Sequence, residues 1–86
     1  MIDVFFTPSF DRTIRKLDIA LIEEISDTVE LLKDERLHAR IKVHKLHGRM
    51  KGFFAASVDY RHRIVFRYVS KTSILLVDFG DHSVYE

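Results

Sequence analysis

Two side chains that can take part in proton transfer stand close to the C-terminus, three residues apart. His82 and Tyr85 lie in a short segment, Gly80 to Tyr85, that directly follows an apolar run. An imidazole gives or takes a proton near pH 7, and a tyrosine stacks on a base or donates its hydroxyl. A lone histidine in such a place is more often a surface residue, so its chemistry depends on the groups beside it.

Three arginines precede that run and alternate with apolar residues. Ile64, Phe66 and Tyr68 share one face of a strand predicted near residues 61–68, and the opposite face carries Arg61, Arg63 and Arg67. Guanidinium groups about 7 to 14 Å apart on a strand match successive phosphates, and each binds a phosphate through two N–H groups. Pairing with acidic neighbours is the alternative, but only Asp59 and Asp78 lie on flanking strands. The sequence predicts a cationic sheet face that binds a polyanion.

Together these groups supply what RNA cleavage without a metal requires. The reaction needs a base for the 2′-hydroxyl proton, an acid for the departing 5′-oxygen and fixed positive charge on the phosphorane. His82 and Tyr85 offer the proton-transfer groups, and the arginines offer the charge. No carboxylate cluster with metal-ligand spacing suggests a competing reaction.

A second basic segment, residues 44–52, contains the pair His44 and His47. On a strand, this spacing places the two rings on opposite faces, and no further ligand is near, so no metal ion is expected. No phosphate-binding loop follows Gly48 or Gly52, and no cofactor is expected. We expect contact with phosphates or bases instead, and the residues assigned to RNA binding are Lys45, His47, Arg49, Lys51, Arg61 and Arg67. His62, next to a turn, is expected to be exposed and without a role.

Charge is sorted along the chain, although the formal net charge is only +1. Residues 1–35 carry four basic and nine acidic side chains, whereas residues 36–67 carry nine basic side chains and a single acidic one, Asp59. Such a basic stretch is the electrostatic footprint of a protein that binds a polyanion, with phosphates as the obvious candidate. A solvated surface is the alternative that composition leaves open.

Length and composition limit the class of protein. A chain of 86 residues with 47% hydrophobic side chains is expected to form one domain over residues 1–86. Cysteine is absent, which excludes a disulfide framework and a thiolate metal site. The apolar runs are far shorter than the roughly 18 residues of a membrane span, and the N-terminus, with Asp3 early, does not resemble a signal peptide. We expect a soluble cytoplasmic protein with no membrane partner.

Hydrophobic periodicity predicts an α+β fold. Thr7 can cap a helix that Pro8 begins, and Asp18 can cap a second helix with apolar residues at spacings of three and four up to Leu32. Beyond residue 42 the period changes from 3.6 to 2. Strands are predicted over residues 2–6, 42–46, 53–58, 63–68 and 73–79, with a hairpin turn over residues 59–62. Two helices should pack on one face of a small, mostly antiparallel sheet of four or five strands.

Several of these segments, in this order, resemble the RelE/ParE superfamily of bacterial toxins from type II toxin–antitoxin systems. The resemblance covers essentially the whole chain, and the segments that carry it are H-K-L-H-G from His44, K-G from Lys51, V-D-Y-R-H-R-I-V-F from Val58 and L-L-V-D-F-G-D-H-S-V-Y from Leu75. The resemblance implies a small α+β toxin that a cognate antitoxin wraps and neutralises. In the RelE-like branch it implies an mRNA endonuclease that acts without metal in the ribosomal A site, with operator DNA bound only through the antitoxin.

The resemblance also assigns roles to particular residues. Arg63 would stabilise the transition-state phosphate, and His82 and Tyr85 would take acid, base or stacking roles. His44 holds the place of a histidine that contributes in some members, whereas no glutamate here matches the base of others. The ParE branch, which inhibits DNA gyrase without cleaving RNA, is the alternative. A catalytically silent regulator that binds operator DNA with its antitoxin is a third possibility. Retention of Arg63, His82 and Tyr85 favours the RNA-cleaving branch.

Overall fold

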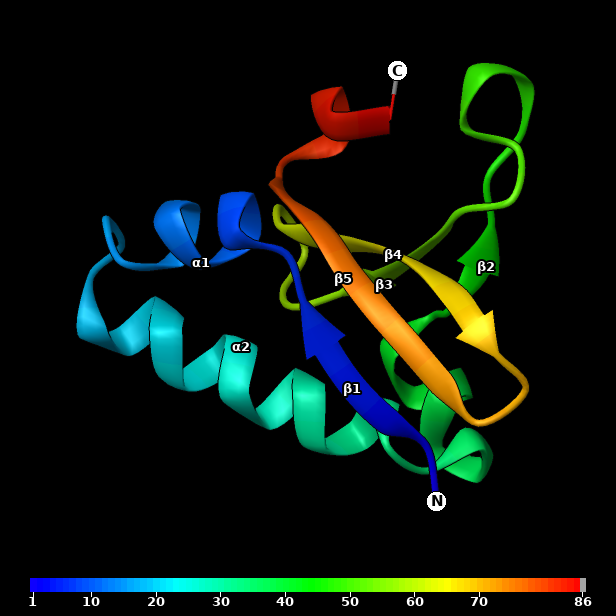
Figure 1. The fold of residues 1–86 in the computed structure, drawn as a ribbon. Helices are drawn as coiled ribbons and strands as arrows, with labels where there is room; N and C mark the ends of the chain where they lie inside the picture. Colours follow the sequence, from blue (N-terminus) through cyan, green and yellow to red (C-terminus); the bar gives the residue numbers. More distant parts are fainter. Residues whose placement is uncertain (86) are drawn as a thin grey trace.

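The computed structural model describes residues 1–85, with side chains described through residue 84. Within this range the chain forms two α-helices and a five-stranded sheet (Figure 1). The helices are α1 (Pro8–Ile14) and α2 (Ile19–Leu32), and the strands are β1 (Asp3–Phe6), β2 (His44–Lys45), β3 (Phe54–Ser57), β4 (Arg63–Ser70) and β5 (Ser73–Gly80). The α+β class predicted from the sequence is confirmed.

The sheet has the strand order β1-β5-β4-β3-β2, with β1 and β2 at its two edges. β5 pairs in parallel with β1, and the other neighbours pair in antiparallel fashion, so the sheet is mostly antiparallel as expected. The register between β4 and β5 shifts between Val65 and Phe66, which leaves Val77 as an extra residue on β5. This bulge lets both Leu76 and Phe79, three residues apart, face the same side of the sheet.

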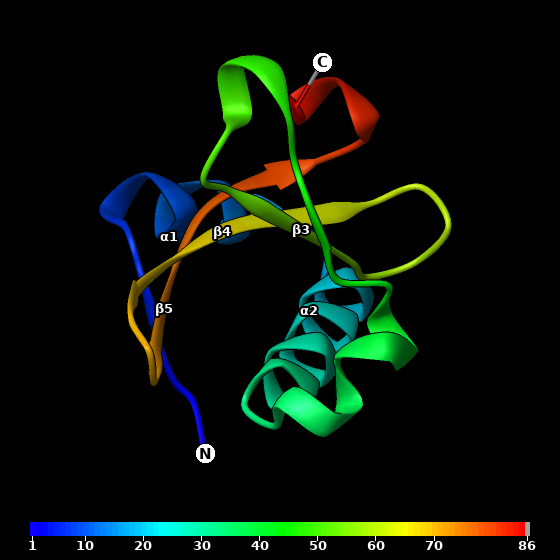
Figure 2. The same cartoon turned by 90° about the vertical axis from the view of Figure 1, so that its right-hand side faces the viewer.

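Both helices pack on one face of the sheet, which places the main core between the two layers (Figure 2). Phe10 from α1 and Ile25 and Leu32 from α2 are buried against the strands. The strand residues of this core are Ala56, Ile64, Phe66, Ile74, Leu76 and Phe79. The rings of Phe54 and Phe66 stack with their centroids 5.6 Å apart, and Tyr68 meets Phe54 edge-on at 5.3 Å.

The helix starts follow the capping chemistry that the sequence predicts. The Thr7 side chain accepts a hydrogen bond of 3.0 Å from the Phe10 N–H, and Pro8 occupies the first turn of α1. The Asp18 carboxylate accepts one of 2.9 Å from the Leu21 N–H at the start of α2. These caps satisfy backbone donors that have no partner inside the helix.

The connection from α2 to the sheet differs from the prediction. Residues Glu35–Ile41 form a 3₁₀ helix in place of an irregular segment, and Lys42 follows it with a left-handed backbone (φ 53°). The strand predicted over residues 42–46 is therefore shorter, His44–Lys45, because Lys42 ends the 3₁₀ helix and cannot extend the ladder. None of the helices in the described part of the chain has the length and apolar character needed to cross a membrane.

The packing of α2 against the sheet can be tested by truncating Leu32, whose side chain is fully buried. Leu32→Ala should lower the free energy of unfolding by about 2 to 5 kcal/mol, since it removes buried methyl groups and leaves a cavity. The control is Ile19→Ala at the other end of the same helix, where the side chain is 71% exposed and little should change. Urea unfolding followed by circular dichroism measures both, and equal losses would contradict this core.

Candidate functional site

The sheet face turned away from the helices carries two of the predicted site residues, His44 and Arg63, in neighbouring rows. His44, Ala55 and Val65 pair across β2, β3 and β4, so their side chains share this face. In the next row, Arg63 pairs with Gly80 on β5. Val65 and Arg63 are two residues apart on one strand, which is about 7 Å. The alternation predicted for β4 is confirmed, because Ile64, Phe66 and Tyr68 face the helices.

The sequence predicts an open, cationic face, but side chains from other segments cover part of this face. Val65 is fully buried, and it forms a second apolar cluster with Leu46 and Ala55. Partly buried side chains cover the cluster, namely Met50, Phe53, Val77 and Val84. The loop around Met50 and the C-terminal 3₁₀ turn His82–Tyr85 therefore lie side by side over the sheet (Figure 2). The predicted cationic face is an apolar patch with charged groups around it.

The three arginines take three different positions. Arg61 lies before β4 begins, in the turn over residues 59–62, and is exposed. The Arg63 guanidinium donates hydrogen bonds of 2.8 and 3.0 Å to the carbonyl oxygens of Asp59 and His62. Arg67 is exposed near the other end of β4, where it pairs with Leu75. The three arginines therefore do not form one row on a strand, since Arg61 lies outside β4 and Arg63 also holds the turn. Phosphate binding by these arginines stays a prediction.

The turn that carries Arg61 is fixed by the Asp59 carboxylate. Asp59 accepts hydrogen bonds from the backbone N–H groups of Arg61 (2.8 Å) and His62 (2.7 Å), and the His62 Nδ1 lies 3.0 Å from both carboxylate oxygens. Partial burial alone would raise the pKa of Asp59, but hydrogen bonds from the His62 ring and from these N–H groups outweigh it and lower the pKa to about 2. Asp59 therefore stays ionised and keeps the turn closed.

His62 is partly buried and holds the turn, although the sequence predicts that it is exposed and without a role. Its ring is stacked on Phe79, with the centroids 5.4 Å apart and the planes 9° from parallel. Its side chain is 28% exposed. Because Phe79 belongs to the main core, His62 anchors the turn to the body of the sheet.

A shallow depression of about 490 Å³ opens between this turn and the end of β5. Tyr60 and Arg61 line it from the turn, and Asp81, His82 and Ser83 line it from the C-terminal segment. Ser83 donates hydrogen bonds to Asp81 Oδ1 from its hydroxyl (2.7 Å) and its N–H (2.9 Å), and these bonds lower the pKa of Asp81. The depression brings the exposed guanidinium of Arg61 and the exposed imidazole of His82 to one place. Arg63, the arginine to which the resemblance assigned the transition-state phosphate, is not among the residues that line it.

Gly80 sets the position of His82. A Cβ atom at Gly80 would lie 2.5 Å from Val84 Cγ1, far inside a normal contact. A side chain at residue 80 would therefore force Val84 to shift, so the close packing of Val84 over the end of β5 depends on this glycine. Val84 then packs on the second apolar cluster, and His82 lies beside the turn at residues 59–62.

The remaining predicted residues are spread more widely. His44 is exposed on the site face, and its Nδ1 lies 2.8 Å from the Lys42 carbonyl oxygen. Lys45 pairs with Phe54, whose ring lies in the helix-side core, so Lys45 stands on the other side of the edge strand. The three that follow, His47, Arg49 and Lys51, are exposed on the loop beside the terminal turn. The side chain of Tyr85 lies outside the described residues.

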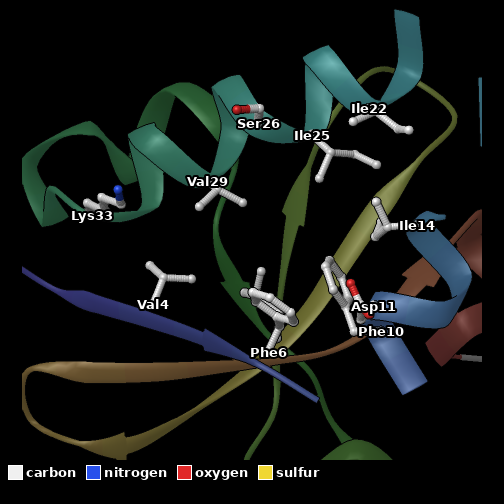
Figure 3. A pocket seen from close by; sticks show the side chains of 11 residues that line it. Val4, Phe6, Phe10, Asp11, Ile14, Ile22, Ile25, Ser26, Val29 and Lys33 are labelled. Carbon is white, nitrogen blue, oxygen red and sulfur yellow. The ribbon is translucent and has the colours of Figure 1, made fainter. Parts of the chain in front are cut away.

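Two other features of the described residues bear on the chemistry that the chain can perform. In the part of the chain that the structure describes, no three His, Cys, Asp or Glu side chains are grouped so that they could hold a metal ion. An apolar hollow of about 300 Å³ lies between β1, α1 and α2, lined by residues that include Val4, Phe6 and Phe10 (Figure 3). It contains none of the predicted site residues and lies on the helix side of the sheet.

Sequence reasoning missed Tyr60, Asp59 and Asp81 as parts of this site. Asp59 followed by a turn is a recognisable signal, because aspartate side chains bind backbone N–H groups two residues further on. Nothing in the sequence indicated a role for Tyr60, because hydrophobic periodicity does not predict the contacts of a residue at the tip of a turn. The contact between that tip and the segment after β5 depends on the pairing of β4 with β5.

Comparison with known proteins supports the fold. No protein-family model matches the sequence, and no curated protein does so. The YoeB/ParE toxin from Agrobacterium tumefaciens is similar with a TM-score of 0.77 at 21% identity, covering 94% of this chain and 99% of that one. The archaeal RelE–RelB complex from Pyrococcus horikoshii is similar with a TM-score of 0.73 at 15% identity, covering 93% of this chain and 93% of that one. The YoeB–YefM complex from Staphylococcus aureus is similar with a TM-score of 0.72 at 15% identity, covering 95% of this chain and 98% of that one.

These comparisons define the class of fold. The chain has the fold of the RelE/ParE superfamily toxins over nearly its whole length, which confirms at the level of structure the resemblance found in the sequence. At such low identities a shared fold does not establish an activity, because one fold can carry different functions.

The role of Asp59 can be tested by pH. Since its pKa is lowered from 3.8 to about 2, its charge stabilises the fold above about pH 4, and this contribution is lost as the pH falls toward 2. Asp59→Asn should therefore unfold at lower urea than the wild type at pH 5 to 7, and the difference should shrink toward pH 2. Asp34, whose pKa is also about 2, is present in both proteins and cancels. A difference that stays constant over this range would contradict the role given to Asp59.

The role of Gly80 can be tested by a pair of substitutions. Gly80→Ala should shift the backbone amide resonances of Asp81, His82 and Ser83, because the new methyl group displaces Val84 and the terminal turn. Adding Val84→Ala removes the atom that clashes and should return these resonances toward those of the Val84→Ala single variant. Two-dimensional NMR of the labelled protein measures all three. Unchanged resonances in Gly80→Ala would contradict the close approach.

Proposed function

We propose that this chain, as one domain over residues 1–86, is the toxin of a type II toxin–antitoxin system that cleaves mRNA on the ribosome without a metal. The observation that carries the proposal is the depression shared by Arg61 and His82, in a chain with the fold of RelE/ParE toxins. The strongly basic stretch over residues 36–67, which includes Arg61 and the exposed loop residues His47, Arg49 and Lys51, supports RNA as the ligand.

The proposed reaction is an attack within the RNA chain. The 2′-hydroxyl gives its proton to a base, and its oxygen forms a bond to the adjacent phosphorus. The bond from phosphorus to the 5′-oxygen breaks, and that oxygen takes a proton from an acid. The products are a 2′,3′-cyclic phosphate and a free 5′-hydroxyl. The negative charge that develops on the phosphorane needs fixed positive groups beside it.

Each group has a place in this scheme. His82 is the proposed proton-transfer residue, because it is exposed in the depression with Arg61. Arg61 and Arg63 are the proposed cationic groups, with Arg63 also holding the turn through the carbonyl oxygens of Asp59 and His62. The roles of Tyr85 and His44 rest on the resemblance to the RelE-like branch. His44 lies on the same sheet face as Arg63.

A cognate antitoxin is the proposed protein partner. Two of the similar structures are toxin–antitoxin complexes, YoeB–YefM and RelE–RelB. Because residues 36–67 are strongly basic, we propose that an acidic antitoxin segment covers the site face and excludes phosphates from it. Binding to operator DNA would occur only through the antitoxin. The mRNA and ribosome are cytoplasmic, which places the proposed toxin there.

Expression of the chain alone in bacteria tests the activity. The wild type should stop growth and produce new transcript ends within reading frames, and co-expression of the cognate antitoxin should restore growth. His82→Gln should slow cleavage by about 10²- to 10⁴-fold, the range for loss of a general acid or base. Arg61→Ala should also reduce cleavage. The control is Arg12→Ala, an exposed arginine on α1, which packs on the opposite face of the sheet from Arg63, and this variant should remain toxic.

Transcript ends, mapped by primer extension, separate this proposal from its competitors. Growth arrest with intact transcripts and a DNA-damage response would contradict RNA cleavage and support gyrase inhibition. Absence of any growth effect would contradict a toxin and support a regulator that acts with its antitoxin. Full toxicity of His82→Gln combined with Arg61→Ala would show that the depression is not the site.

A further inference from the structure

Tyr60 presents an aromatic ring to solvent at the edge of the proposed site. Its exposed fraction is 84%, compared with 54% for Phe5 and 57% for Phe6. Polar residues are usual at the tip of a turn, because an exposed aromatic ring leaves apolar surface in contact with water, which costs free energy. The ring also lines the same depression as Arg61 and His82.

The backbone that carries Tyr60 is held unusually firmly for a turn. The Asp59 carboxylate binds the N–H groups of Arg61 and His62, and the Val58 N–H donates a hydrogen bond of 3.0 Å to the His62 carbonyl oxygen. The Arg63 guanidinium binds the carbonyl oxygens of Asp59 and His62 from the strand side. Through the stacking of His62 on Phe79, the turn is fixed to the core. The backbone of the turn therefore needs little further ordering when a ligand meets the Tyr60 ring.

The walls of the depression differ in charge. Arg61 lies next to Tyr60 on the turn, and the Asp81 carboxylate lies on the opposite wall, with its Oδ1 bound by Ser83. A phosphate is attracted to the side of Arg61 and repelled from Asp81. A nucleobase has a flat apolar face that can stack on a tyrosine. Its edge carries N–H groups that can donate hydrogen bonds to a carboxylate.

We infer that Tyr60 is a stacking platform for one unpaired nucleobase of the RNA, next to the phosphate bound by Arg61. This inference rests on the proposed function and names a part of the substrate site. Stacking recognises the aromatic face of any base, so Tyr60 contributes to affinity and to the placement of the adjacent phosphate, and not to the proton transfers. The Tyr60 hydroxyl is not required, because the ring alone provides the contact.

A binding experiment with a labelled RNA tests this inference. The probe is a short 2′-O-methyl RNA oligonucleotide containing one 2-aminopurine, which cannot be cleaved because it has no free 2′-hydroxyl next to a phosphate. The wild type and Tyr60→Phe should quench the 2-aminopurine fluorescence with similar Kd values. Tyr60→Leu should lose the quenching, and its Kd should rise by about 5- to 150-fold, the range expected for loss of one stacked base.

The matched control is Phe5→Leu, which removes an exposed ring from the edge strand β1 and should leave both Kd and quenching unchanged. Wild-type protein that binds without quenching or does not bind, or Tyr60→Leu that quenches normally, would overturn the inference. Loss of antitoxin co-purification by Tyr60→Leu with unchanged RNA binding would overturn it in favour of a protein contact. New transcript ends in cells expressing the wild type report on the proposed function separately, so the two can fail independently.

Discussion

Three consecutive residues of β4, Ile64, Val65 and Phe66, have no exposed surface, and this double-sided burial constrains the rest of the structure. Neighbouring residues of a strand face opposite sides, so a run of this kind requires cover on both sides of the sheet. The helices cover Ile64 and Phe66. Val65 requires a second cover, which a chain of 86 residues supplies from its loop around Met50 and from its last residues. The candidate site lies where the second of these segments, the last residues of the chain, meets the turn at residues 59–62.

The cover over Val65 links stability to function. Val84 packs on the same cluster as Val65, and its place over Gly80 holds the terminal turn close to the sheet. His82 is in that turn, so the apolar contact of one residue fixes the polar group of another. On the opposite wall, Asp59 and His62 fix Arg61 and Tyr60 in a similar way, with Phe79 as the apolar anchor. Both walls of the depression are therefore positioned by side chains that have no proposed contact with RNA.

The sequence could predict the elements because their signals are local. The Thr7 and Asp18 caps and the change of period from 3.6 to 2 each depend on residues close together in the chain. Alternation also gave the correct faces for Ile64, Phe66 and Tyr68 on one side of β4 and for Val65 on the other. It could not show what covers Val65, because the covering residues come from distant segments. The hydrogen bonds from Arg63 to the preceding turn could not be predicted either. They depend on the direction of the carbonyl groups of Asp59 and His62, which the sequence does not give.

The charge sorting along the chain is only partly a sorting in space. The acidic first part forms α1 and α2, and the exposed residues of α2 include Glu23, Asp27 and Glu30. The basic part begins with the 3₁₀ helix that carries Arg36 and Arg40 and packs against α2, and it continues into the loop and strands that carry the candidate site. A two-layer fold separates the groups on its two outer surfaces by more than the Debye length of about 8 Å at physiological salt. In the proposed function, an RNA bound near the basic loop is therefore little repelled by the acidic surface of α2.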